Sequence, residues 1–177
     1  MRKLKNEELK RISIEEFKES KKMNVCVVLD DIRSMHNVGS TFRTGDAFLI
    51  EKVWLCGITG KPPHREIHKT ALGATESVEW EHTRDITILI DELKLKGYTI
   101  ISIEQADQSI SLSDFKPDPT RKYALVFGNE VFGVKDEIVE KSDLVLEIPQ
   151  HGTKHSLNIS VSVGVVLWDF VSKLGLN

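Results

Sequence analysis

The sequence has few cysteines and no long apolar run. Its two cysteines, Cys26 and Cys56, form no Cys-x-x-Cys pair and no Cys/His cluster, so nothing indicates a metal site. Both fall in expected strands, where we expect small buried side chains in a reducing compartment. No apolar segment is long and uninterrupted enough to span a bilayer. Residues 1–10 lack the apolar core of a signal peptide, and we expect a cytoplasmic protein.

A surplus of positive charge is also missing. The formal net charge is −3, although residues 1–22 hold eight Lys/Arg against five Asp/Glu. Residues 79–119 instead hold nine Asp/Glu against four Lys/Arg. Salt confines electrostatic attraction to about 10 Å, so a basic end can still bind a polyanion locally. The alternative to polyanion binding is that these charged residues form an ordinary solvated surface.

Short apolar strands alternate with helices along the chain. This alternation predicts an α/β fold with a mainly parallel sheet flanked by helices. Its length suits one domain, which we place at residues 23–177 after an N-terminal helical extension at residues 1–22. The extension has capping-box spacing at Ser13 to Glu16 and an apolar stripe expected to pack on the body. We expect strands at 25–29, 52–56, 78–81, 99–103, 123–127 and 144–148, and helices at 37–48, 65–72, 85–96, 134–141 and 156–174.

The last helix is apolar around most of its circumference between residues 157 and 171, and such a helix is expected to be buried. Ser160, Ser162 and Gly164 are small enough to let another backbone approach closely. The polar loop 150–155 directly precedes this helix. A buried helix below a polar loop can hold a binding site rigidly; an ordinary core helix with a capped start is the alternative.

A first candidate motif lies where the strand at 25–29 leads into a helix. Its residues are NVGSTFR, from Asn37 to Arg43. We expect Asn37 to cap the helix, and Gly39 and Ser40 to leave the backbone accessible to an anion. Arg43 could then fork onto phosphate oxygens. A capped helix with a surface arginine is the structural alternative.

A second candidate motif, LVFGNEVFGV, runs from Leu125 to Val134. A buried strand leads into Gly128 and Glu130, and ligands of open α/β sheets bind beyond the carboxyl ends of the strands. Glycine there would allow close backbone approach to a ligand. The pattern is not Gly-x-Gly-x-x-Gly, which excludes a dinucleotide fingerprint, and a tight αβ turn is the alternative.

Taken together with IPQHGTKHSLNISVSVGVVLW at 148–168, these motifs resemble, in order, those of the SpoU (TrmH-like) RNA 2′-O-methyltransferases of the SPOUT superfamily. The resemblance implies a C-terminal trefoil knot, a feature that ordinary topology makes very rare. It also implies S-adenosylmethionine as cofactor and a homodimer in which the knot helices pack together, which suits the apolar helix.

The resemblance assigns roles to particular residues. It makes Arg43 the catalytic candidate, positioned with the ribose by Asn37, Glu130, Ser156 and Asn158. It places the cofactor, held mainly by backbone, at Ile103, Glu104, Gly128, Ile148, Ser156 and Leu157.

A basic segment at residues 64–74 is expected to face RNA. His64 and His68 have a spacing found in metal sites, but no third ligand accompanies them, and we expect no metal. The chain is similar to the family members that methylate a D-loop guanosine of tRNA, and rRNA is the other candidate substrate. A non-catalytic knot-fold RNA-binding protein and a flavodoxin-like module are the rival classes. The RNA-binding candidates are Arg33, Arg43, Lys61, His64, Arg65 and Lys69.

Overall fold

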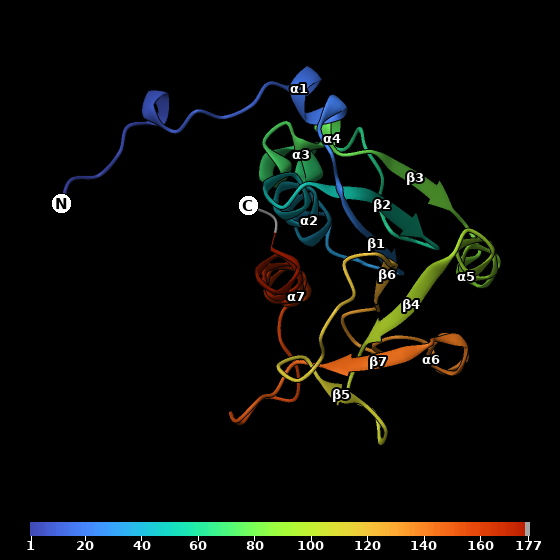
Figure 1. Ribbon diagram of the computed structural model, residues 1–177. Helices are drawn as coiled ribbons and strands as arrows, with labels where there is room; N and C mark the ends of the chain where they lie inside the picture. Colours follow the sequence, from blue (N-terminus) through green and yellow to red (C-terminus); the bar gives the residue numbers. More distant parts are fainter. Residues whose placement is uncertain (176–177) are drawn as a thin grey trace.

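The computed structural model describes residues 1–175, and a seven-stranded sheet forms its centre (Figure 1). All strand pairs are parallel, so the predicted parallel α/β fold is confirmed. The trefoil knot remains a prediction. The strands from edge to edge are β3 (Trp80–Thr83), β2 (Ile50–Cys56), β1 (Met23–Asp30), β6 (Lys122–Phe127), β4 (Tyr98–Ile103), β7 (Leu144–Glu147) and β5 (Ile110–Ser111).

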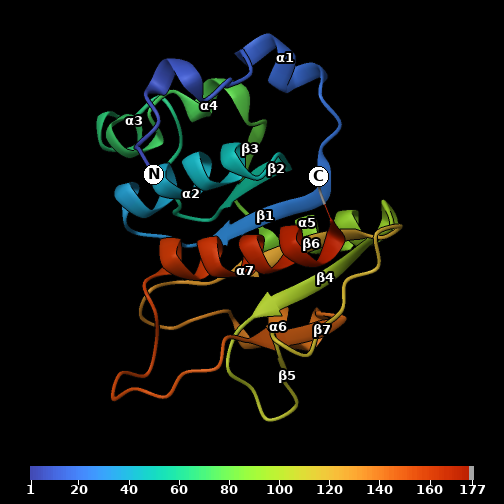
Figure 2. The ribbon, with the colours of Figure 1, turned by 60° about the vertical axis from the view of Figure 1, so that its left-hand side comes forward.

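Helices cover both faces of the sheet, as Figure 2 shows for α2 and α7 in front and α5 and α6 behind. A 3₁₀ turn at Asn6–Glu8 precedes them. One face carries α1 (Ile14–Glu19), α2 (Met35–Ala47), α3 (Arg65–Ala71), α4 (Ala74–Ser77) and α7 (Ile159–Leu174). The other face carries α5 (Ile86–Leu95) and α6 (Asp136–Lys141).

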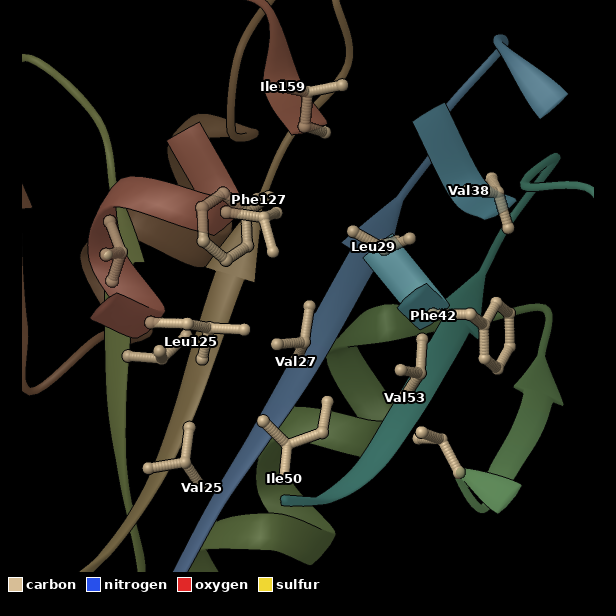
Figure 3. Close-up of a cluster of buried hydrophobic side chains, with 14 of the residues drawn as sticks. Val25, Val27, Leu29, Val38, Phe42, Ile50, Val53, Leu125, Phe127 and Ile159 are labelled. Carbon is tan, nitrogen blue, oxygen red and sulfur yellow. The ribbon is translucent and has the colours of Figure 1, made fainter. Parts of the chain in front are cut away.

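The central strand β1 supplies both hydrophobic cores. Val25, Val27 and Leu29 belong to the core under α2 and α7 (Figure 3). Cys26 and Val28 belong to the core under α5 and α6. Successive side chains of a strand point to opposite faces, so a strand buried on both sides must be apolar throughout. This explains the unbroken apolar run, and it confirms that Cys26 is buried.

Helix α7 is buried on only one side, which corrects the expectation of a fully buried helix. Val161 and Trp168 are 51% and 62% exposed, and Val165 is also exposed. A Cβ added at Gly164 would meet no atom within 4 Å, so no other backbone of residues 1–175 approaches there. The side packed on the sheet consists of Val163, Val166, Leu167 and Phe170.

Some element boundaries also differ from the expectation. Helix α2 begins after Ser34, whose hydroxyl accepts the N–H of Asn37 at 3.3 Å, so Asn37 lies in the first turn and does not cap. Helix α7 begins after Asn158, which caps it through Ser160 N–H at 2.9 Å. Two short elements, α4 and β5, were not expected. Both are too short to leave a periodic pattern in the sequence.

The N-terminal extension projects from the body (Figure 1). Ser13 caps α1 in the predicted capping box. Of the predicted apolar stripe, only Phe17 packs on the body, where it is buried in the core, whereas Leu4, Leu9 and Ile12 are exposed. Within residues 1–175, no helix combines the length and apolar character needed to cross a membrane.

Candidate active site

A cavity of about 750 Å³ opens beyond the carboxyl ends of β4, β6 and β7, beside the start of α7. This is the crevice where open α/β sheets bind ligands. Its wall includes Glu130 and Asn158 as well as apolar side chains. All residues assigned to the cofactor line this single cavity, namely Ile103, Glu104, Gly128, Ile148, Ser156 and Leu157.

The three motifs meet at the mouth of the cavity. The Glu130 carboxylate accepts the backbone N–H groups of Arg33 at 3.0 Å and Ser34 at 3.1 Å. It also accepts Nδ2 of Asn37 at 3.2 Å. Asn158 donates its own Nδ2 to Oδ1 of Asn37 at 3.2 Å. Three of the four residues predicted to position Arg43 and the ribose therefore form one hydrogen-bonded chain.

The Glu130 carboxylate is held in its charged form. Partial burial raises its pKa, but the N–H groups of Arg33 and Ser34 and the amide of Asn37 lower it more, so the net pKa is below its usual value. Hydrogen bonds to the ionised form have this effect. Glu130 is therefore an anion that fixes the loop ahead of α2, and it is poorly suited to accept a proton.

The loop that carries Glu130 is rigid because of Asn129. Its Oδ1 accepts the N–H groups of Val131 and Phe132 at 2.9 and 3.2 Å, and its Nδ2 donates to the Asp31 carbonyl at 2.7 Å. A Cβ on Gly128 would lie 2.1 Å from the carbonyl of Gly133. Gly128 is thus required by the chain's own packing. That it also lets a ligand approach the backbone remains a prediction. Sequence reasoning quoted Asn129 within the motif but gave it no role.

The opposite wall of the cavity is tied together by Glu104. Its carboxylate accepts Val134 N–H and Gln105 N–H, both at 2.9 Å. Gln105 then donates Nε2 to the His155 carbonyl at 2.7 Å. Glu104 therefore contributes a side chain that joins loops, as well as the backbone that was expected to hold the cofactor.

An ion-pair cluster that sequence reasoning missed lies behind the same loops. Lys135 contacts the carboxylates of Asp30 at 3.1 Å and Asp31 at 2.8 Å. Burial raises the pKa of Asp30 despite Lys135. Asp31 also accepts Ile58 N–H at 2.9 Å. Lys135 follows Asp30 by 105 positions, so no local pattern could have revealed the pair.

The first motif is only partly what it was expected to be. Gly39 is buried, and a Cβ there would lie 2.3 Å from the Ile67 carbonyl. It lets α3 pack against α2 and does not present backbone to an anion, which corrects that expectation. Arg43 is exposed, and within residues 1–175 it makes no hydrogen bond or ion pair with another side chain. Ser156 is exposed on the cavity wall, completing the predicted positioning group.

The remaining RNA-binding candidates are all at the surface. Arg33, Lys61, His64, Arg65 and Lys69 are exposed. Lys69 pairs with Glu66 at 2.7 Å, and Nδ1 of His64 accepts Glu66 N–H at 3.2 Å.

Residues 24–168 match the SpoU rRNA Methylase family. The chain belongs to this family. The resemblance drawn from the three motifs is therefore confirmed, and the methylase family supplies the class of reaction.

Similar proteins act on different RNAs. A tRNA (guanosine(18)-2′-O)-methyltransferase of Borreliella burgdorferi is 29% identical over 165 residues, which are 93% of this chain and 74% of the relative. The crystal structure of the Aquifex aeolicus TrmH/SpoU tRNA modifying enzyme has a TM-score of 0.80 at 27% identity, covering 92% of this chain and 82% of that one. An AdoMet-bound rRNA methyltransferase from Sinorhizobium meliloti shares the fold, with a TM-score of 0.79 at 22% identity over 88% of this chain and 59% of that one.

Proposed function

We propose that this SpoU family member transfers the methyl group of S-adenosylmethionine to a ribose 2′-hydroxyl of structured RNA in the cytoplasm. A D-loop guanosine of tRNA is the first candidate target, and rRNA is the second. The observation that carries the proposal is that the second and third motifs line one cavity and are both hydrogen-bonded to the first motif at its mouth. Glu130 bonds Asn37 and Asn158 bonds Asn37, although the sequence separates the first pair by 93 positions and the second by 121.

The cavity fits the proposed cofactor. It offers apolar walls at Ile103, Ile148 and Leu157 beside polar groups at Gln105 and Ser156. Such a mixture suits a ligand with a flat purine and a polar tail. When bound, S-adenosylmethionine supplies a methyl carbon activated by its sulfonium.

The protein's task is then to align a weak nucleophile. The hydroxyl oxygen must approach the methyl carbon in line with the carbon–sulfur bond, and its proton must leave. A guanidinium is too basic to take that proton. We assign Arg43 the role of gripping the phosphate next to the reacting ribose, so that a phosphate oxygen can share the proton. Asn37, Glu130 and Asn158 hold together the loop before α2 and the first turns of α2 and α7. Fixed geometry of this kind accelerates transfer.

The experiment is a methyl-transfer assay with tritiated S-adenosylmethionine on unmodified bulk tRNA and on rRNA, followed by nuclease digestion to identify the modified nucleotide. We expect label in a 2′-O-methylated nucleoside, with tRNA labelled faster than rRNA. Tight RNA binding without label in either RNA would favour the rival, a knot-fold RNA-binding protein without catalysis.

We also propose that the chain forms a homodimer through the exposed side of α7. Val161, Val165 and Trp168 form an apolar stripe at helical spacing that residues 1–175 leave uncovered, and a second copy of the same stripe is a self-complementary partner. Val166 is unsuitable for testing this idea because it lies in the core.

Val165→Asp is expected to convert the dimer to a monomer that is still folded, because a charge on the stripe cannot be buried unpaired. Sedimentation velocity at micromolar concentration measures the change, and circular dichroism checks the fold. Ile88→Asp, on the exposed side of α5, is the matched control and should leave the mass unchanged. An unaltered dimer of Val165→Asp would place the interface elsewhere.

A further inference from the structure

A second cavity, of about 530 Å³, lies between the loop after β2, helices α3 and α4, and the start of β3. The lining residues of the two cavities do not overlap. The methyl-transfer chemistry described above makes no use of it. The residues that matter for its chemistry are Pro63, His64, Arg65, Ile67, Glu76 and Trp80.

One wall of this cavity is a fixed aromatic ring. Trp80 is partly buried and packs against the core under α2 and α7. Its backbone pairs with Val53 in the sheet. The ring therefore has little freedom to move. Pro63 and Ile67 add apolar surface around it. A rigid aromatic surface in an otherwise apolar recess is what an unstacked nucleobase requires, because every base can stack on it.

Two polar side chains of this cavity, Glu76 and His64, keep polar atoms available to a ligand. Glu76 is an exposed carboxylate, and the residues described offer it no ion pair or side-chain hydrogen bond. His64 uses Nδ1 to accept Glu66 N–H at 3.2 Å, so the neutral ring carries its proton on Nε2, which can donate. The cavity thus offers one acceptor with two oxygens and at least one donor.

This arrangement selects among the bases. A carboxylate can accept two parallel N–H groups, and guanine presents N1–H and the N2 amino group side by side on its Watson–Crick edge. Adenine offers a single amino group there, next to an acceptor that would face the carboxylate. Guanine O6 and N7 accept hydrogen bonds, which suits the donors of His64 and Arg65.

The local charge also favours a nucleic acid. Glu66 contacts Lys69 and His36, both at 2.7 Å, so the charge of Lys69 is partly neutralised. Lys61 and Arg65 are exposed and pair with no carboxylate in the part of the chain the structure describes. They can contact the phosphates on either side of a bound base.

We propose that this second cavity holds one unpaired guanine of the RNA substrate, stacked on Trp80 and read by Glu76, away from the nucleotide that is methylated. The proposal rests on the proposed function, because it takes RNA to be the substrate. Holding a second nucleotide would fix the register of the RNA on the protein and help select it, while the ribose enters the first cavity.

The test uses the full chain and fluorescein-labelled RNA heptamers of uridine with guanosine, inosine or adenosine at the centre. Anisotropy titrations are made with saturating S-adenosylhomocysteine, so that the first cavity is filled. We expect the guanosine heptamer to bind about tenfold more tightly than the adenosine one, the scale of a good bidentate base contact. Inosine, which lacks the N2 amino group, should fall between them.

The decisive variant is Glu76→Gln, which keeps the side chain's size and lies at an exposed position, so the fold should persist. It should bring guanosine and adenosine within about twofold of each other, since one carboxylate oxygen has become a donor. Glu92→Gln, at an exposed position on α5, is the control and should keep the full preference.

Equal binding of the heptamers by the wild type, or a guanosine preference that survives Glu76→Gln, would overturn the proposal. The methyl-transfer assay separates the two ideas. Transfer without the Glu76-dependent preference defeats the second cavity alone. The preference without any transfer defeats the proposed function alone.

Discussion

Arg43→Lys should lower single-turnover methyl transfer by about 100-fold or more, the scale of lost alignment. Lysine keeps the positive charge but loses the planar fork that can hold a phosphate and a hydroxyl together. The guanidinium is exposed and forms no ion pair with the rest of the described chain, so its replacement should leave the fold intact. RNA affinity should change far less, because several Lys and Arg share the phosphate contacts.

The measurement combines single-turnover rates at saturating RNA with separate titrations of RNA and of S-adenosylmethionine. Arg84→Lys, at another exposed arginine, is the matched control and should retain the wild-type rate. A near-normal rate for Arg43→Lys would remove the assigned role. Weak RNA binding with normal chemistry at saturation would instead make Arg43 a docking residue.

Glu130→Gln should be the second severe change. The carboxylate accepts N–H groups from Arg33 and Ser34 before α2 and from Asn37 in its first turn. The amide replaces one acceptor oxygen with a donor that faces donors. We expect a loss of about 1 kcal/mol in the free energy of unfolding, modest because water reaches the carboxylate. Turnover should fall by about 100-fold, because the loop before α2 loses its anchor. Glu140→Gln, at an exposed position of α6, serves as control.

The stability effect has a definite pH dependence. The pKa of Glu130 is lower in the folded protein than its ordinary value, so the charged carboxylate stabilises the fold above the unfolded pKa of about 4.3. That contribution is lost as the pH falls through the lower, folded pKa. Urea titrations should therefore show the full difference between wild type and Glu130→Gln near pH 7 and a shrinking difference below about pH 4. A difference independent of pH would mean that Glu130 acts through shape and not through charge.

The sequence was sufficient to predict features that depend on local chemistry. Apolar runs bounded by Gly, Asn and Pro locate the strands, and the capping residues around Ser13 locate α1. The resemblance of the three motifs to the SpoU family implied that Asn37, Glu130 and Asn158 would act together.

Features that depend on distant neighbours could not be predicted. A glycine beside a ligand and a glycine beside a remote backbone look alike in sequence, so the role expected of Gly39 was wrong and the packing role of Gly128 was missed. An apolar position at helical spacing does not reveal which chain covers it, so buried Val166 and exposed Val165 appeared equivalent. Asn37 was predicted as the cap of α2, but Ser34 caps it, and both residue types cap well.

Through the hydrogen bonds of Asn129 and Glu130, one loop contributes to the sites of both the cofactor and the RNA. The segment 128–134 is a wall of the large cavity, and the same segment holds the loop that precedes α2. A molecule bound in the cavity therefore contacts the same rigid segment that positions the surface where the RNA phosphate is expected, and this shared segment couples the two sites. By thermodynamic reciprocity, the factor by which cofactor tightens RNA binding equals the factor by which RNA tightens cofactor binding.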